Sequence, residues 1–504
     1  MSNKLHESVG GKQVVTRFAP SPTGKLHIGG LRTALFCYLF AKKHGGRFIL
    51  RIEDTDRNRF DPEAEDYIQN SLEWVGMIPD ESPWVGGPNG PYRQSERDYS
   101  GHIKFLLDND FAYRAFDTPE ELGMARQEDK WFSYAGENRQ KMRNDLSLGK
   151  EEGDRLVADG VPFVVRFKMP DNEDVSFTDI IRDKVTQNTS QLDDKVIVKS
   201  DGIPTYHLAN VCDDHDMEVT HVIRGEEWIS STPLHVLLYK AFGWDIPEFA
   251  HLPLILNPDG KGKLSKRTAL RLGFPVLPVG GDGTDHKGRE VVYKGFKDDG
   301  YYPDALINFL LLLGWSPGEG DREFFTMEEA IDAFSLEGVN KSGARFTIDK
   351  AKWFNQQYLQ NKDADDLKHH IDLGDTFTYD DERMSVILDL AKKRSTFPQE
   401  MNAVTDIFFK PVVLSQAEKD KTTDDFKTVM PMFVDKADEI DWDDANDIKQ
   451  MIYELSKETK SRMGAVMRPL RQAIADGVSG PDLATTMYVL GKDECLTRIN
   501  AMLN

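Results

Sequence analysis

The sequence predicts an α/β protein in which a doubly wound parallel sheet is interrupted by an inserted α+β domain and followed by helical domains. Three observations support this fold class. A strand, a loop and a helix open the chain and lead to a second strand. Short strand patterns mixed with charged helical stretches occupy residues 113–198, and the pattern beyond residue 263 is mostly helical. With 504 residues, the chain is expected to form several packed cores.

The start of the sheet is predicted from its order of patterns. Residues 14–18 are β-branched and aromatic, residues 19–24 are rich in turn-forming residues, and residues 27–43 have a helical pattern. Two glycines at residues 45–46 stop the helix, and a second strand follows at residues 47–52. These segments predict a right-handed parallel βαβ unit. Because such sheets bind ligands at the carboxyl ends of their strands, the loop after the first strand is a candidate binding loop.

An inserted domain is expected next, with strand patterns at residues 163–169 and 195–198. Apolar strands and helices then resume, with strand patterns at residues 221–224 and 252–256 that should complete the first sheet. Residues 273–288 are rich in Gly and Pro and are expected to form an inserted loop, to which we assign no function.

The composition argues against several classes of protein. The three cysteines, Cys37, Cys212 and Cys495, are far apart and form no CxxC pair, which argues against a disulfide framework and a thiolate zinc site. The longest apolar run, residues 305–315, is too short to span a membrane. Residues 1–13 lack the pattern of a secretory signal, so a cytoplasmic protein is expected.

The formal net charge of −22 is unusual for a protein that binds nucleic acid through a broad basic face. Two local basic stretches exist, at residues 261–271 and 457–471. They are either nucleic-acid contacts or solvated helix faces, and the charge alone does not separate these alternatives.

Several motifs stand together in this chain. They are RFAPSPTGKLHIGG at residues 17–30, RIEDTDR at 51–57, GPYRQSER at 90–97, SDGIPTYHLANVCDDH at 200–215, VIRGEEW at 222–228 and KGKLSKR at 261–267. They resemble the signature motifs and the amino-acid pocket of class I aminoacyl-tRNA synthetases, in the form typical of bacterial glutamyl-tRNA synthetases. The resemblance is close over most of the catalytic part and looser in the helical C-terminal third.

The resemblance implies a Rossmann-like catalytic domain and a two-step reaction. L-Glutamate and ATP form glutamyl-adenylate and pyrophosphate, and the glutamyl group then passes to the 3′-terminal adenosine of tRNA(Glu) with release of AMP. The implied domains are catalytic halves at residues 1–112 and 205–259, an acceptor-binding insertion at 113–204, a helical stem-contact domain with the lysine loop at 260–342, and helical anticodon-binding domains at 343–400 and 401–504.

An ATP site is expected where the first helix begins. His27 follows a Gly-bounded loop, so backbone donors and the positive end of the helix should face a triphosphate. Gly29 and Gly30 leave room for an adenosine moiety against the helix start. A structural histidine is the alternative for His27 when this motif is considered alone.

The lysine loop is the second part of the expected ATP site. Lys263 and Lys266, with Ser265 between them, can converge on the α- and β-phosphates as charge builds up during displacement of pyrophosphate. Taken alone, the loop is better explained as a mobile surface loop with solvated lysines, but its pairing with the His27 motif reverses this preference and favours ATP binding. Neither a P-loop nor a GxGxxG motif is present to bind the nucleotide instead.

Recognition of glutamate requires cations for its carboxylates and an anion for its ammonium group. By resemblance, the side-chain carboxylate is held by Arg17, Arg224, Tyr206 and Asn210. The amino group is received by Glu53, Ser21 and the backbone of Ala19, and Trp228 walls the pocket. For either arginine alone, the alternative is a surface ion pair. A planar guanidinium matches a carboxylate better than an amide, which favours glutamate over glutamine.

No resident metal is expected. Asp213, Asp214, His215 and Asp216 are consecutive, so their side chains cannot all point to one centre. Some relatives hold a zinc ion in the inserted domain, but the corresponding residues 113–116 of this chain contain no cysteine. Magnesium is expected to arrive with ATP, held chiefly by phosphate oxygens.

Contacts with tRNA are implied only by resemblance. Asp56 is expected near the tRNA 3′ end, and Arg471, within residues 467–481, against an anticodon base, where a guanidinium can stack and hydrogen-bond. A solvated Arg471 on an amphipathic helix is the alternative. Whether tRNA(Gln) is also charged is left open, and a monomer is the default expectation.

Three rival functions are considered. A glutaminyl-tRNA synthetase and a truncated enzyme that modifies tRNA with glutamate are disfavoured by the arginine pair and the long helical tail. A nonenzymatic tRNA-binding relative is expected to lack His27 or the lysine pair, and all three residues are present.

Overall fold

The computed structural model describes residues 13–56, 59, 61–284, 288–318, 320–374, 377–410, 424–460, 462–475 and 482–503. The chain forms two compact units, Met1–Asp298 with Leu306–Ile348, and Asp299–Ala305 with Asp349–Asn504. Residues 1–12, to which the expectation of no secretory signal applies, lie outside the described residues. The same holds for residues 476–481, the end of the segment 467–481. Within the described parts, each helix is too short or too polar to cross a membrane.

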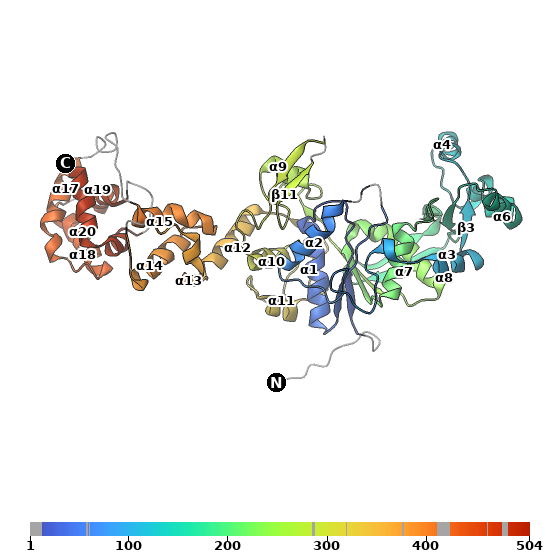
Figure 1. The fold of residues 1–504 in the computed structure, drawn as a ribbon, viewed down its shortest axis with the longest axis horizontal. Helices are drawn as coiled ribbons and strands as arrows, with labels where there is room; N and C mark the ends of the chain where they lie inside the picture. The colour runs from blue at the N-terminus through green and yellow to red at the C-terminus, as the bar shows by residue number, and fades with distance from the viewer. Residues whose placement is uncertain are drawn as a thin grey trace. The chain divides into compact units, whose positions relative to one another are not determined.

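A six-stranded sheet forms the centre of the first unit (Figure 1). Its order is β2 (Arg47–Leu50), β1 (Val15–Phe18), β8 (His221–Gly225), β9 (Glu248–Leu252), β5 (Asp174–Asp179) and β6 (Asp183–Asn188). The first five strands in this order are parallel to one another, and the sixth, β6, is antiparallel to β5. The predicted parallel α/β sheet is therefore confirmed.

The first helix, α1 (Ile28–Lys43), connects β1 to β2 and packs against β1, β2 and β8. Leu31, Leu35 and Leu39 repeat at helical spacing and are completely buried. His27 caps the amino end of α1, so this helix starts directly at the carboxyl edge of the sheet. Two further helices, α7 (Tyr206–Asp216) and α8 (Thr232–Phe242), lie on either side of β8 in the chain.

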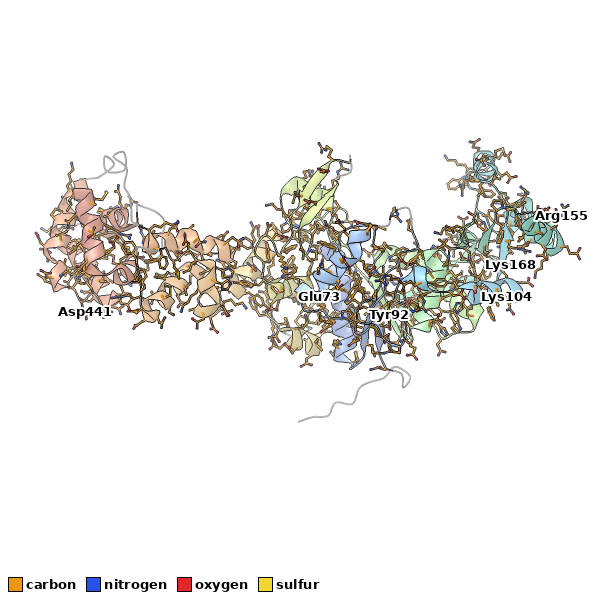
Figure 2. The ribbon with its side chains drawn as sticks, viewed as in Figure 1. Glu73, Tyr92, Lys104, Arg155, Lys168 and Asp441 are labelled. Carbon is orange, nitrogen blue, oxygen red and sulfur yellow. The ribbon has the colours of Figure 1, made fainter. Side chains whose placement is uncertain are left out.

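The segment predicted as an insertion contributes to two sheets. Its strands β4 (Val164–Phe167) and β7 (Val196–Val198) join β3 (Ala112–Ala115) in a three-stranded antiparallel sheet, near Arg155 and Lys168 in Figure 2. However, β5 and β6 extend the main sheet. Buried and exposed residues alternate along β5, a pattern that indicates a strand but not which sheet the strand joins. The predicted domain boundaries stay a prediction.

The expectation of a loop over residues 273–288 was wrong at its C-terminal end. β11 (Gly281–Thr284) pairs with β12 (Glu290–Tyr293) in an antiparallel hairpin next to α9 (Lys266–Leu272) (Figure 1). β11 has the sequence GDGT, which carries no apolar alternation. Its strand conformation therefore comes from pairing with the β-branched β12 rather than from its own sequence pattern.

The second unit is helical, as predicted. The helices from its beginning to its end are α12 (Ile348–Gln360), α13 (Ala364–Leu367), α14 (Asp381–Lys392), α15 (Met401–Phe409), α17 (Asp424–Asp435), α18 (Ala445–Glu458), α19 (Met463–Ala475) and α20 (Leu483–Leu503). Leu388, Phe408, Phe433, Leu455 and Leu470 are completely buried in one shared core.

The other α-helices and strands of the described residues come before α12 in the chain. They are α2 (Pro62–Trp74), α3 (Ser100–Asp108), α4 (Pro119–Glu128), α5 (Asp145–Leu148), α6 (Lys150–Ala158), β10 (Ile255–Leu256), α10 (Pro303–Leu312), α11 (Met327–Ala333) and β13 (Ala344–Arg345).

The backbone at Gly46 lies very close to the backbone at Val14, where the strands β1 and β2 begin. The Arg47 N–H donates to the Val14 carbonyl at 2.9 Å, and a Cβ added to Gly46 would overlap that same carbonyl oxygen. We expect Gly46→Ala to lower the free energy of unfolding by about 1–3 kcal/mol, because the backbone must shift to relieve the overlap.

Chemical denaturation of the full chain measures this effect. The matched control is Gly101→Ala in α3, where an added Cβ has no atom within 4 Å. This helical change should be neutral or stabilising by up to about 1 kcal/mol. Equal behaviour of the two variants would contradict the packing explanation.

Candidate active site

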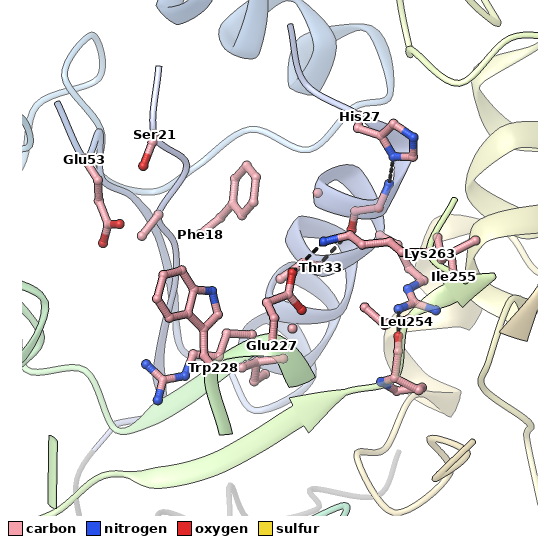
Figure 3. Close-up of a pocket in the computed structure, with 18 of the residues that line it drawn as sticks. Phe18, Ser21, His27, Thr33, Glu53, Glu227, Trp228, Leu254, Ile255 and Lys263 are labelled. Carbon is pink, nitrogen blue, oxygen red and sulfur yellow. Dashed lines mark hydrogen bonds and ion pairs between the residues drawn. The ribbon is translucent and has the colours of Figure 1, made fainter. Parts of the chain in front are cut away.

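A cavity of about 430 Å³ opens at the carboxyl ends of β1 and β8 (Figure 3). It lies where the order of the strands reverses in the sheet, since β1 is followed in space by β2 on one side and by β8 on the other. The predicted residues that line it are Arg17, Ala19, Ser21, His27, Gly29, Gly30, Glu53, Tyr206, Asn210, Arg224, Trp228 and Lys263. The His27 motif and Lys263 therefore share one cavity with the predicted glutamate residues.

His27 is held in one orientation at the start of α1. Its Nδ1 accepts a hydrogen bond from the Gly29 N–H at 3.0 Å, and its buried Nε2 has no partner among the described residues. Burial, with the nearby charges of Lys266 and Lys263, lowers the pKa of His27 to about 3. The ring is therefore neutral, and because Nδ1 accepts, Nε2 carries the hydrogen and is available as a donor.

The two predicted lysines differ in their surroundings. Lys263 Nζ forms an ion pair with Glu227 at 2.8 Å on the edge of the main cavity (Figure 3). Lys266 is the first residue of α9 and lines a neighbouring cavity with Gly24. Burial, with the nearby Lys25, lowers the pKa of Lys266. Lys263 therefore lines the main cavity and Lys266 the neighbouring one, and their convergence on the phosphates of ATP stays a prediction.

Ser265 has a structural role in addition to any contact with ligand. It caps the amino end of α9, where its Oγ accepts a hydrogen bond from the Thr268 N–H at 3.2 Å. Gly30 likewise has a packing role, because a Cβ there would press on the Leu26 side chain. Both positions are thus constrained by the fold as well as by the expected nucleotide.

Arg224 is buried at the other end of the cavity and is surrounded by neutral groups. It donates to Thr232 Oγ1 at 2.9 Å, to His251 Nε2 at 3.1 Å, to the Tyr206 hydroxyl at 3.2 Å and to His235 Nδ1 at 3.2 Å. No ion pair of Arg224 is found within the described ranges. Its positive charge is therefore oriented without being neutralised.

Aromatic rings close this end of the cavity. The rings of Tyr206 and Trp228 stack with centroids 4.1 Å apart. Trp228 comes from the turn after β8, and Tyr206 begins α7. The stacked pair holds the Tyr206 hydroxyl beside Arg224 and gives the polar groups an apolar wall.

The acidic cluster of residues 213–216 forms ion pairs with buried arginines. Asp214 lies between Arg17 at 3.0 Å and Arg51 at 2.7 Å. Burial favours the protonated carboxyl, but the charges of Arg17 and Arg51 lower the pKa of Asp214. Asp213 faces Arg51 at 3.6 Å and Arg97 at 2.7 Å. In α7 these carboxylates act as counterions that fix the arginines.

The remaining members of the cluster point elsewhere. His215 stacks on Trp244 with centroids 3.8 Å apart, and Asp216 pairs with Arg97 at 3.0 Å. The segment at residues 113–116 belongs to β3 and its continuation, where the Tyr113 hydroxyl donates to Asp194 at 2.6 Å. Among the residues described, no group of His, Cys, Asp and Glu is arranged to hold a metal ion.

Arg51 is the main site residue that the sequence interpretation missed. It is completely buried and contacts the carboxylates of Asp213, Asp214 and Glu53. Its distance to Glu53 is 3.3 Å. Asn210 also donates to Glu53, at 3.2 Å. Arg51 was visible in the motif RIEDTDR two residues before Glu53, but only the fold shows that α7 brings two carboxylates to it. Glu227, the ion-pair partner of Lys263, was also missed, because only the fold brings these two residues together.

Neither of the predicted tRNA residues is among the lining residues of this cavity. Asp56 forms an ion pair with Arg59 at 2.7 Å in the loop after β2. Arg471 belongs to α19 in the second unit and is partly buried. Their proposed contacts involve the nucleic acid rather than the amino acid, so a position outside the cavity is compatible with them.

The chain was compared with known protein families. Residues 13–275 and 286–353 match the catalytic domain of class I tRNA synthetases (E and Q), and residues 353–503 match an anticodon-binding domain. A parallel sheet with a His27 helix start and a lysine loop at its carboxyl edge is the arrangement expected from the signature motifs. The fold and the site therefore define a class I tRNA synthetase.

Whole-chain relatives narrow the family. The chain is 46% identical to glutamate–tRNA ligases of Flavobacterium johnsoniae and Bacteroides thetaiotaomicron, over 97% of this chain and 98% of each relative. It also resembles the crystal structure of a glutamate–tRNA ligase from Elizabethkingia meningosepticum in complex with its amino acid, with a TM-score of 0.88, 47% identity and coverage of 98% and 99%. For the glutamate–tRNA synthetase of Elizabethkingia anophelis the TM-score is 0.85, at 47% identity and coverage of 98% and 100%. The chain belongs to the glutamate–tRNA ligase family, which consists of ATP-dependent ligases.

Arg51 provides a test of the charge arrangement. Arg51→Met removes the cation shared by three buried carboxylates, so we expect the free energy of unfolding to fall by about 3–5 kcal/mol. Lys104→Met is the control, because it breaks an exposed pair between Lys104 and Asp108 (Figure 2) and should cost less than about 1 kcal/mol. Denaturant titrations of both variants give the values, and similar losses would show that burial of the pair is unimportant.

Proposed function

We propose that the cavity binds glutamate at its Arg224 end and ATP at its His27 end, and that the chain joins glutamate to tRNA(Glu) in two steps. An α-carboxylate oxygen of glutamate attacks the α-phosphorus of ATP, and the bond to the departing pyrophosphate breaks. A hydroxyl of the 3′-terminal ribose then attacks the carbonyl carbon of the glutamyl-adenylate, and AMP leaves. Positioning and electrostatic stabilisation supply most of the catalysis.

One observation carries this proposal: a single cavity is lined both by Arg224, held by neutral partners, and by His27 with an unpartnered Nε2. The first group is suited to an acidic side chain, and the second to a phosphate. Their common cavity brings a carboxylate and a nucleotide into one space, as adenylate formation requires.

In the amino-acid end, Arg224 and Arg17 receive the side-chain carboxylate with Tyr206 and Asn210. The charge on Arg17 is already shared with Asp214, so Arg224 supplies most of the attraction. Glu53, Ser21 and the Ala19 backbone receive the ammonium group, and Trp228 excludes water. These roles combine the resemblance with the lining of the cavity.

In the nucleotide end, His27 donates from Nε2 to a phosphate oxygen, while Gly29 and Gly30 face the adenosine. Lys263 leaves Glu227 to contact the phosphates, Lys266 approaches from the neighbouring cavity, and Ser265, at the start of α9, joins them. Magnesium enters with ATP and is held chiefly by phosphate oxygens.

Recognition of tRNA uses both units. Asp56 contacts the 3′ end, residues 113–204 contact the acceptor stem, and Arg471 contacts an anticodon base. The match of residues 353–503 to an anticodon-binding domain supports the last assignment. Whether tRNA(Gln) is charged as well depends on the anticodon contacts, and a cytoplasmic monomer is the expected form.

Exchange of labelled pyrophosphate into ATP tests the activity. The full chain is assayed with glutamate or glutamine, with and without tRNA(Glu). We expect exchange with glutamate and tRNA together and little exchange with glutamine, because the amide does not match the two guanidiniums. Binding of tRNA without any exchange would instead identify a nonenzymatic tRNA-binding protein. Charging of separated glutamate and glutamine tRNAs settles the tRNA range.

Lys266→Ala tests the phosphate role. We expect the rate of pyrophosphate exchange to fall by about 100-fold or more, because a charge aimed at the transition state is lost. The affinity for tRNA, measured by filter binding, should change little. Lys261→Ala, on the exposed part of the same loop, is the matched control and should keep nearly full activity. Normal exchange by the Lys266 variant would contradict the assignment.

A further inference from the structure

Three neighbouring parallel strands each end in a residue of one hydrogen-bonded chain. Arg224 lies on β8, His251 on β9 and Asp179 at the end of β5. The Arg224 Nε donates to His251 Nε2 at 3.1 Å, and His251 Nδ1 lies 2.6 Å from the Asp179 carboxylate. The side chains of His251 and Asp179 are completely buried. They lie behind the cavity, since neither is among its lining residues.

The direction of each hydrogen bond follows from the chemistry of the groups. A guanidinium Nε–H can only donate, so His251 Nε2 must accept and must carry no hydrogen. The hydrogen of the neutral imidazole is then on Nδ1, which donates to Asp179. Burial lowers the pKa of His251, against the opposing effect of Asp179, in agreement with a neutral ring.

Asp179 is fixed by the backbone around it. One carboxylate oxygen accepts from the N–H groups of Ile181 at 3.0 Å and Arg182 at 2.8 Å. The other accepts from the His251 N–H at 3.1 Å as well as from the His251 ring. With these bonds in place, the carboxylate can present only an acceptor to the imidazole, which selects the tautomer that Arg224 needs.

Placing the carboxylate behind an imidazole has an electrostatic consequence. A carboxylate in direct contact with Arg224 would orient the guanidinium but would also neutralise it, as Asp214 does for Arg17. His251 transmits the orientation and leaves the charge on Arg224 for a ligand. His235 Nδ1, which also accepts from Arg224, is a second neutral acceptor of this kind.

We propose that Asp179 and His251 are positioning residues that orient Arg224 and thereby set the affinity and selectivity for the side-chain carboxylate of glutamate. This inference rests on the proposed role of Arg224 in binding glutamate. It also gives a function to β5, the strand that joins the main sheet from the segment predicted as an insertion.

Variants of His251 separate positioning from packing. His251→Phe keeps a ring but removes the acceptor. His251→Gln can place its amide oxygen near the former Nε2 and so keep an acceptor for Arg224. His251→Asn is polar but too short to reach Arg224. The Gln and Asn variants are therefore a matched pair of amides that differ in whether they reach Arg224. The full chain is assayed by pyrophosphate exchange with tRNA(Glu) present, and thermal unfolding reports whether each variant is folded.

We expect His251→Phe and His251→Asn to raise the KM for glutamate by about tenfold or more, because a hydrogen bond to a charged group is lost. The KM for ATP should stay within about twofold, and His251→Gln should recover most of the glutamate affinity. Asp179→Asn should resemble His251→Asn. The amide oxygen of the new Asn is needed by the N–H groups of Ile181 and Arg182, so its NH2 group would face His251 Nδ1 and reverse the imidazole tautomer.

Arg224→Gln distinguishes failure of this inference from failure of the proposed function. If Arg224→Gln raises the KM for glutamate while both His251 amide variants behave like the unmodified chain, the positioning role is wrong and the glutamate site stands. If Arg224→Gln leaves the KM for glutamate unchanged, the glutamate site itself is wrong. Equal increases in the KM values for glutamate and ATP in His251→Asn and His251→Gln would indicate a merely structural residue and would overturn the inference.

Discussion

The active site depends on burying several guanidinium groups beside one another at the carboxyl ends of the strands. Each buried cation loses the solvation of water and must find hydrogen-bond acceptors inside the protein. Arg17 and Arg51 obtain them from the carboxylates of α7, so that this helix fixes Arg17 at the cavity and Arg51 behind it. Arg224 obtains them from neutral groups. The choice of acceptor decides which arginine can still attract an anion.

The same constraint separates the two ends of the cavity. At the His27 end, burial, together with the charges of Lys266 and Lys263, lowers the pKa of the imidazole and keeps it neutral and hydrogen-donating. Lys263 at this end forms its ion pair with Glu227 at an exposed edge of the cavity. An exposed ion pair is weak and is easily exchanged for a phosphate contact. The ion pairs of Arg17 and Arg51 are buried, whereas the pair of Lys263 is exposed to water.

The motifs predicted the residues of the cavity better than the connections between them. The strand, loop and helix around His27 followed from local patterns, and so did the helical second unit. The buried pairs of Arg51 and the place of Asp179 did not, because they join residues far apart in the chain through a sheet order that no local pattern records. The acidic residues beginning at Asp213 were noticed, but their counterion role required knowing which strand α7 covers. β11 was missed because its strand conformation depends on its partner.

A segment at the edge of the matched family ranges is tied to the start of α1. The family match stops at residue 275 and resumes at residue 286, so residues 276–285 lie outside the matched ranges. The first N–H groups of a helix need partners from outside the helix. In α1 the N–H of Ile28, next to His27, donates to the carbonyl of Val276 at 2.9 Å. Since this bond uses only backbone atoms, side chains in this segment can vary while the start of α1 stays in place.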